Sequence, residues 1–171
     1  AEANAGLKFS PSANSITAGH FDVQASTSNV DGGLEGNLST ATVNITPIAD
    51  TPSVTNASTN EDTQSAAGLV ISRNAADSTE VTHFKITSIV GGTLYKNDGT
   101  TAIANNSFIT FAEGNAGLKF TPSANSISNG SFNIQSSTSN VDGGLGGSTA
   151  TATITVSAIA DTPSITAATT N

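Results

Sequence analysis

Two identical stretches of the chain, SNVDGG, place one carboxylate beside a pair of glycines, at Asp31 and again at Asp142. Carboxylates and the backbone carbonyls of Gly-rich loops are oxygen ligands of the kind that Ca²⁺ prefers. An Asp-Gly pair is also among the commonest turn sequences. The two aspartates therefore fit two interpretations, a cation ligand and a plain turn, and the rest of the sequence has to distinguish them.

The balance of charge favours cations as partners. The 171 residues include 13 acidic and 5 basic side chains, which gives a net charge of −8. Because binding to phosphate backbones needs clustered Lys or Arg, we expect no nucleic-acid partner. No run of 18 apolar residues is present, so we expect no membrane insertion in this segment.

Residues that could carry out catalysis are scarce. The chain has no cysteine, and neither His20 nor His83 belongs to a spaced cluster of acidic or metal-ligating residues. The repeat partner of His20 is Ser131, so the module does not need a histidine there. Since the sequence also lacks a nucleophile elbow, a phosphate-binding glycine loop and a paired-carboxylate glycosidase signature, we predict that the protein is not an enzyme.

The SNVDGG stretches belong to a long internal repeat. Residues 1–60 and 112–171 align at a constant offset of 111, and forty of the sixty positions are identical. A repeat of this length has the size of a whole β-sandwich domain. We therefore predict the C-terminal half of one module at residues 1–50, a complete module at 51–161, and the start of the next module or a linker at 162–171.

A half-module exposes open sheet edges, so we expect residues 1–60 to be unstable alone. This expectation leaves two possibilities: the chain is a segment of a longer array of modules, or another chain supplies the missing strands.

Strand periodicity runs through the predicted complete module. Apolar residues alternate with polar ones in nearly every segment, and Thr, Gly, Asn and Ser dominate the composition, as is typical of strands and tight turns. We predict about seven short antiparallel strands, no long helix and a turn at Asn97–Gly99, which together indicate an all-β Greek-key sandwich. The expected strands include a broken first strand in SVTNASTNEDT (Ser53–Thr63), a second at Gly68–Asn74 and a later one in SFITFA (Ser107–Ala112). The expected inward residues are Phe84, Ile86, Leu118, Phe120, Phe132, Ile134, Ala150, Ala152, Ile154 and Val156.

One segment of the repeat resembles the end of a cadherin-like domain. VDGGL…STATVNITPIADTP (Val30–Pro52) and its copy at Val141–Pro163 have an Asp-Gly-Gly loop, a final strand and an Asp-x-Pro linker. GTLY and GLKFTPSAN are more similar to the cadherin-like repeats of giant bacterial surface adhesins that are exported by type I secretion. The resemblance implies an all-β fold of tandem cadherin-like or Ig-like sandwich modules, with a repeat of about 111 residues, and an extracellular location at the cell surface or in a biofilm matrix.

The resemblance also implies calcium at module junctions. Two things depart from the cadherin pattern: the linker IADTP has a single acid, and Ala75 replaces the first Asp of an Asp-x-Asp pair. Because this junction has fewer carboxylates than the cadherin pattern, it favours one bound ion over three. Glu80 and Asp98 are interpreted as surface charges. Carried over by position, the ligands at the first junction are Glu2, Asp50, Asp77 and Asp142, and those at the next are Glu61, Glu113 and Asp161.

These features predict a structural extender of a long adhesin, a stalk of modules stiffened by calcium that serves attachment or biofilm formation. Its partners are neighbouring identical modules in the same chain or in adjacent chains. One alternative is a subunit of an extracellular matrix filament assembled by strand complementation. Another is a module that binds carbohydrate or protein, for which the single tyrosine, Tyr95, is a poor candidate.

Overall fold

The computed structural model of the protein describes residues 3–170. The described residues form eleven β-strands, one short α-helix and four 3-10 turns. The chain divides into two compact units, Ala1–Pro47 and Ile48–Asn171. None of the helices in the described part is long and apolar enough to cross a membrane. The expectation of an all-β protein without a long helix is confirmed.

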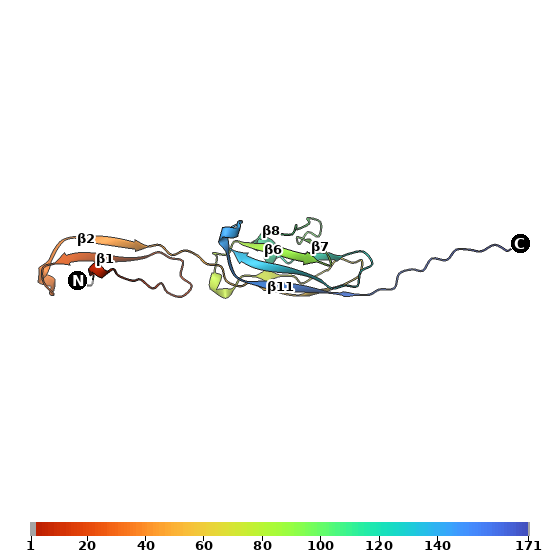
Figure 1. Cartoon of the computed structure of the whole chain (residues 1–171), viewed down its shortest axis with the longest axis horizontal. Coiled ribbons are helices and arrows are strands. Elements are labelled where there is room, and N and C mark those ends of the chain that lie inside the picture. Colours follow the sequence, from red (N-terminus) through yellow and green to blue (C-terminus); the bar gives the residue numbers. More distant parts are fainter. Residues whose placement is uncertain (1–2, 171) are drawn as a thin grey trace. The chain divides into compact units, whose positions relative to one another are not determined.

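The first unit is built on one antiparallel hairpin (Figure 1). Its strands pair from Gly19 opposite Val43 to Ser26 opposite Leu34, with a bulge between Val23 and Ala25. The elements of this unit are η1 (Ala3–Ala5), β1 (Gly19–Ser26), η2 (Asp31–Gly33) and β2 (Leu34–Val43).

The second unit contains a five-stranded sheet in the order β4-β11-β10-β6-β8 and two two-stranded sheets, β3-β5 and β7-β9. The strands are β3 (Ser53–Val54), β4 (Ala57–Asn60), β5 (Ile71–Ser72), β6 (His83–Val90), β7 (Gly92–Tyr95), β8 (Ser107–Thr110), β9 (Lys119–Pro122), β10 (Gly130–Ser137) and β11 (Leu145–Ser157). The short helices are η3 (Ala75–Asp77), α1 (Phe111–Asn115) and η4 (Asp142–Gly144).

The prediction of purely antiparallel pairing is wrong at one pair of strands. β4 lies parallel to β11, with Ala57 opposite Ile154 and Asn60 opposite Ser157. The first strand is broken, as predicted, and after β3 has paired with β5 the chain crosses to the edge of β11 without reversing direction. The side chain of Asn56 fixes the crossing, because its Oδ1 accepts a hydrogen bond of 2.9 Å from the Thr153 N–H.

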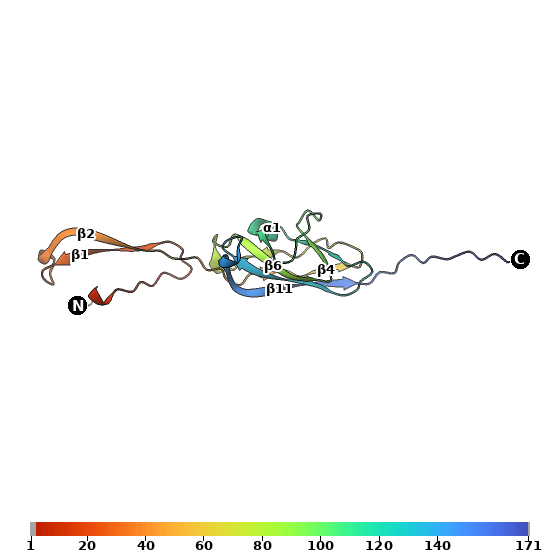
Figure 2. The same ribbon diagram turned by 45° about the horizontal axis from the view of Figure 1, so that its top comes forward.

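Two predicted strands are shorter than expected. The stretch Gly68–Asn74 contributes only Ile71–Ser72 to a sheet. The predicted strand SFITFA ends at Thr110, and the chain then forms α1 (Figure 2). The physical reason is a capping box: Thr110 accepts a hydrogen bond from the Glu113 N–H, and the Glu113 side chain accepts one from the Thr110 N–H.

The predicted alternation of the core strands is largely confirmed. One hydrophobic core contains side chains from all three sheets of the second unit, and burying each large apolar side chain contributes about 1.5–3 kcal/mol. Ala150 is the exception, because it is only half-buried. The buried members of the predicted set are Phe84, Ile86, Leu118, Phe120, Phe132, Ile134, Ala152, Ile154 and Val156.

The hairpin of the first unit reproduces β10 and β11 of the second. Gly130 pairs with Ile154, as Gly19 does with Val43 111 positions earlier, and the bulge recurs between Ile134 and Ser136. The internal repeat in the sequence is therefore also a repeat of local structure. The two hairpins differ in their surroundings, since the apolar side chains of the first are far more exposed.

Candidate functional site

A buried carboxylate lies next to the linker that opens the second unit. Asp77, at the end of η3, is buried, and its Oδ1 accepts a hydrogen bond of 2.7 Å from the backbone N–H of Asp50. Its Oδ2 has no hydrogen-bond partner. The Asn74 side chain positions η3 by accepting a hydrogen bond from the Ala76 N–H. A buried carboxylate with one hydrogen bond is incompletely compensated, because burying a charge is costly unless it is paired.

No basic side chain among the described residues forms an ion pair with Asp77. Within residues 3–170, the ion pairs are Lys85 with Asp142 and Lys96 with Glu113. Arg73, the nearest basic residue along the chain, stacks on the ring of Phe111 instead, at 3.5 Å from the ring centroid. A cation from solvent is one remaining way to balance the charge of Asp77.

Glu80 belongs to the same acidic site, although the sequence suggested only a surface charge. Its backbone N–H donates to the Asp77 carbonyl at 2.9 Å. Partial burial raises the pKa of Glu80, and the charges of Asp77 and Asp50 raise it further. The charges of Asp77 and Asp50 thus act on the Glu80 carboxyl group at the start of the second unit. The signal in the sequence was the spacing D-x-x-E within a turn-rich stretch.

Asp142 lies at the same end of the five-stranded sheet but is engaged elsewhere. It follows β10, whose last residue Ser137 pairs with His83 at the start of β6. Its carboxylate is 2.5 Å from the Lys85 ammonium group, in a pair in which the Asp142 side chain is largely exposed. The structure therefore places Asp142 near the expected end of the unit and gives its charge a partner within the unit.

The second predicted ligand set is not brought together. The Glu61 N–H donates to Ser157 at the end of β11, and its Oε1 accepts a hydrogen bond of 2.8 Å from the Ile159 N–H. Glu113 follows β8 at the opposite end of the sheet, where Thr110 pairs with His83. The expectation that Glu61 and Glu113 lie together is therefore wrong. β8 runs in the opposite direction to β4 and β11, so the residues that follow β4 and those that follow β8 lie at opposite ends of the sheet.

Glu113 has a structural role in the described chain. Its Oε1 accepts a hydrogen bond of 2.7 Å from the Lys96 ammonium group, and its Oε2 accepts one from the Thr110 N–H. The hydrogen bond from Lys96 is the main reason that the pKa of Glu113 is lowered. A carboxylate that is held in this way is a poor choice for a metal ligand.

The remaining predicted ligands are isolated or undescribed. Asp161 is exposed in the segment that follows β11, and Glu2 lies outside the described residues. Among residues 3–170, no group of three or more His, Cys, Asp or Glu side chains is arranged to hold a metal ion together. Asp77 is thus the predicted ligand whose surroundings most clearly fit a cation, since its Oδ2 is buried and unpaired.

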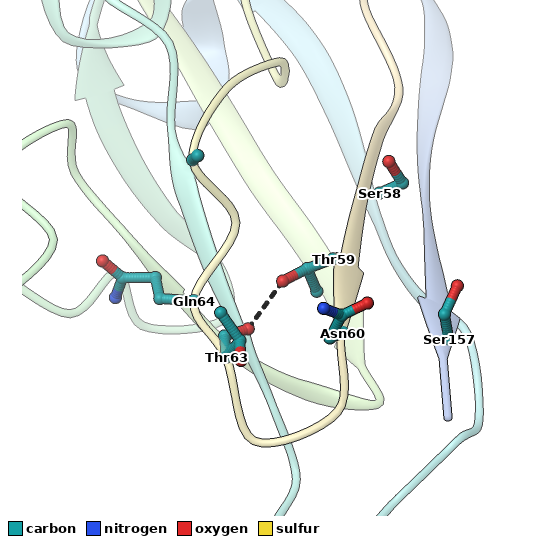
Figure 3. Close-up of a pocket in the computed structure, with 7 residues that line it drawn as sticks. Ser58, Thr59, Asn60, Thr63, Gln64 and Ser157 are labelled. Carbon is teal, nitrogen blue, oxygen red and sulfur yellow. Dashed lines mark hydrogen bonds between the residues drawn. The ribbon is translucent and has the colours of Figure 1, made fainter. Parts of the chain in front are cut away.

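A shallow polar pocket lies beside β4, between that strand and the loop that follows it (Figure 3). The Thr59 hydroxyl donates a hydrogen bond of 2.7 Å to the Thr63 carbonyl across it. The lining offers hydroxyl and amide groups and no aromatic ring on which a sugar could stack. The lining residues are Ser58, Thr59, Asn60, Thr63, Gln64, Ala66 and Ser157.

Comparisons of the chain with protein-family models, with curated proteins and with solved structures found no match.

Proposed function

We propose that the chain is part of a structural extender, a stalk of tandem modules in a long extracellular adhesin that serves cell-surface attachment or biofilm formation. The observation that carries the proposal is the repeated hairpin. Residue pairs of β1 and β2 recur in β10 and β11 at an offset of 111, with the same bulge. Near-identical units in one chain are the means by which repeat proteins gain length. The adhesin and its location rest on the resemblance of Val30–Pro52 to cadherin-like repeats.

Each complete module is, in this proposal, a Greek-key β-sandwich of the cadherin-like or Ig-like type. The five-stranded sheet forms one layer, and the small sheets β3-β5 and β7-β9 form the other. The shared core supports this arrangement, since Phe132 and Ile154 from the large sheet pack in the same cluster as Leu94, Phe120 and Ile71 from the small ones.

Calcium is the proposed cation at the start of each module. The buried, unpaired Oδ2 of Asp77 supports it, as does the pKa of Glu80, which partial burial and the charges of Asp77 and Asp50 raise. Ca²⁺ accepts six to eight oxygen ligands, so the Asp77 carboxylate is supplemented by carbonyls and water. Bound calcium neutralises mutually repelling carboxylates and stiffens the linker that contains Asp50.

The extender role can be tested by adding modules. A version of the chain in which residues 51–161 occur twice is compared with the natural chain by small-angle X-ray scattering, in calcium and in chelator. We expect the maximum dimension in calcium to grow by a constant increment for each added module. A more compact particle, whose maximum dimension does not grow, would contradict the stalk.

A further inference from the structure

One pair of neighbouring strands links the two ends of the second unit. β4 lies at an edge of the five-stranded sheet and runs parallel to β11, from Ala57 opposite Ile154 to Asn60 opposite Ser157 (Figure 2). The chain enters β4 from the end of the sheet at which β11 begins, and it leaves β11 at the other end. The connections to the preceding and following segments therefore leave this strand pair in opposite directions.

Further hydrogen bonds extend the pair at both of its ends. Before β4, the Asn56 Oδ1 accepts a hydrogen bond of 2.9 Å from the Thr153 N–H. After β4, the Glu61 N–H donates to the Ser157 carbonyl at 2.9 Å. The Glu61 Oε1 also accepts a hydrogen bond of 2.8 Å from the Ile159 N–H. Side chains thus lengthen a ladder in which β4 itself contributes only four residues.

The hydrogen bond of Glu61 shows which backbone groups of β4 take part in the ladder. In a parallel pair, alternate residues of an edge strand direct both their N–H and their C=O toward the neighbouring strand, and the residues between them direct both groups away. Because the Glu61 N–H donates to Ser157, the backbone groups of Thr59 face β11, and those of Ser58 face away from it.

The direction of the two strands determines how the pair responds to tension. Tension along the chain pulls β4 toward the end at which it begins and pulls β11 toward the end at which it finishes. The two strands are then forced to slide past each other, and all hydrogen bonds of the ladder resist together. A force that separates the strands from one end instead breaks the bonds one after another. Since forced unfolding depends on the unfolding rate, the sliding direction has the higher barrier.

We propose that β4 and β11, with Asn56 and Glu61 at the ends of their ladder, form a mechanical clamp by which the unit withstands tension between its two ends. Shorter contacts precede the clamp along the chain. The Asp50 N–H is hydrogen-bonded to Asp77, and β3 pairs with β5 over two residues. We expect these contacts to yield first, because each involves few backbone pairs, and the clamp to set the force at which the unit unfolds.

The use of the clamp in a stalk under tension rests on the proposed function, but the resistance of the unit to pulling does not. The two claims can therefore fail separately. A longer array whose maximum dimension does not grow would overturn the stalk and leave the clamp in place. The clamp is tested by pulling on the second unit within the whole chain.

Single-molecule force spectroscopy in chelator can apply both directions of force. The natural chain has no cysteine, so handles can be attached at introduced cysteines. Thr46→Cys with Thr162→Cys places exposed handles before and after the second unit, which loads β4 and β11 in the sliding direction. Thr46→Cys with Gly143→Cys places both handles at the end where β11 begins, and a Cβ at Gly143 meets open space.

We expect the first pair of handles to give the higher unfolding force at the same pulling rate. In both pairs the residues before Thr46 are outside the pulled segment, so the hairpin of β1 and β2 does not contribute. Equal unfolding forces in the two directions, or a lower force in the sliding direction, would overturn the clamp.

Neighbouring proline variants test the ladder itself in the sliding direction. Thr59→Pro removes an N–H that faces β11, whereas Ser58→Pro, the matched control, removes one that faces away from it. We expect Thr59→Pro to lose most of the excess unfolding force and Ser58→Pro to retain it. Equal unfolding forces in these two variants would overturn the assignment of the ladder.

Asn56→Ala keeps every backbone group and decides the matter if Thr59→Pro does not fold, which circular dichroism and thermal unfolding reveal. It removes only the acceptor of the Thr153 N–H. We expect a lower unfolding force than that of the natural residue in the sliding direction. Thr55→Ala is the control, because its hydroxyl accepts from the Val70 N–H outside the clamp, and we expect a smaller loss of force. An unchanged force in Asn56→Ala, or a loss as large in Thr55→Ala, would overturn the role of Asn56 in the clamp.

Discussion

The buried carboxylate of Asp77 accepts a hydrogen bond of 2.7 Å from the backbone N–H of Asp50 and leaves its second oxygen unpaired. The contact ties the linker at the start of the second unit to the turn that precedes β6. It also places the negative charge of Asp77 beside the linker. None of the ion pairs in the described residues involves that charge. The same group is therefore a structural anchor and the strongest candidate for a cation ligand.

Asp77→Ala and Asp77→Asn should separate the anchor from the charge. Asp77→Ala leaves the Asp50 N–H without its acceptor, at a cost of about 1–3 kcal/mol in the free energy of unfolding. Asp77→Asn keeps an oxygen acceptor and removes a buried charge, so in chelator we expect it to be at least as stable as the natural chain. Urea unfolding of both variants in chelator measures the difference. A large loss of stability in Asp77→Asn would mean that the charge is already compensated within the protein.

A glycine beside an aromatic ring should tolerate no side chain. A Cβ at Gly130 would overlap the ring of Phe120 in the buried core, so Gly130→Ala should cost about 1–3 kcal/mol in the free energy of unfolding. Gly143→Ala is the matched control, because a Cβ there meets open space. Thermal unfolding of the two variants compares them. An equal effect at both positions would contradict the packing.

The capping box at the start of α1 should contribute measurably to stability. Thr110→Ala removes the hydroxyl that accepts the Glu113 N–H, and the loss of such a cap costs about 1 kcal/mol. Thr110→Ser retains the hydroxyl and serves as the control, with a smaller effect expected. Chemical denaturation measures both, and an unchanged free energy of unfolding in Thr110→Ala would show that α1 is held by packing alone.

The pair of Lys96 and Glu113 should make stability depend on pH. The lowered pKa of Glu113 means that its carboxylate stabilises the fold above the ordinary glutamate pKa of 4.5. This contribution is lost as the pH falls through the lower pKa of the folded state. Because both side chains are partly exposed, we expect less than about 1 kcal/mol. In Lys96→Gln, the decline of the melting temperature below pH 4.5 should be shallower. An identical decline would exclude this pair as its source.

Hydrogen exchange should distinguish the two copies of the hairpin. At concentrations where the chain is monomeric, amides of β1 and β2 should exchange faster than their counterparts in β10 and β11, because only the latter are covered by a core. Val23 and Ile134 form a directly comparable pair. Equal protection at these two positions would show that the first unit is stable without additional strands.

The sequence predicted the core strands well and the contacts of the charged residues poorly. Alternation identified Phe84, Ile86, Phe132 and Ile134 because burial of one face of a sheet imposes a period of two. It could not reveal that β4 crosses to β11 in parallel, since a strand has the same period in either orientation.

The contacts of the acidic residues are harder to predict from the sequence, because they depend on partners distant in the chain. The resemblance implies a calcium ligand at Glu113, but Lys96 and Thr110 hold its carboxylate. The sequence predicts a surface charge at Glu80, but partial burial and the charges of Asp77 and Asp50 raise the pKa of its carboxyl group. The local patterns T-x-x-E at Thr110–Glu113 and D-x-x-E at Asp77–Glu80 indicate the nearby partners, but the contact of Glu113 with Lys96 and the effect of Asp50 on Glu80 are created only when distant segments pack.

The most direct test of the central claim is the melting temperature of the whole chain, measured by calorimetry in chelator and at about 1 mM calcium, the range typical of extracellular calcium modules. Asp77→Asn is compared with Glu35→Gln, which removes an exposed acid from β2 of the first unit. We predict that calcium raises the melting temperature of the natural chain and of Glu35→Gln, because it binds the folded state, and that Asp77→Asn loses most of the rise. A natural chain that melts at the same temperature in calcium and in chelator would contradict the calcium site.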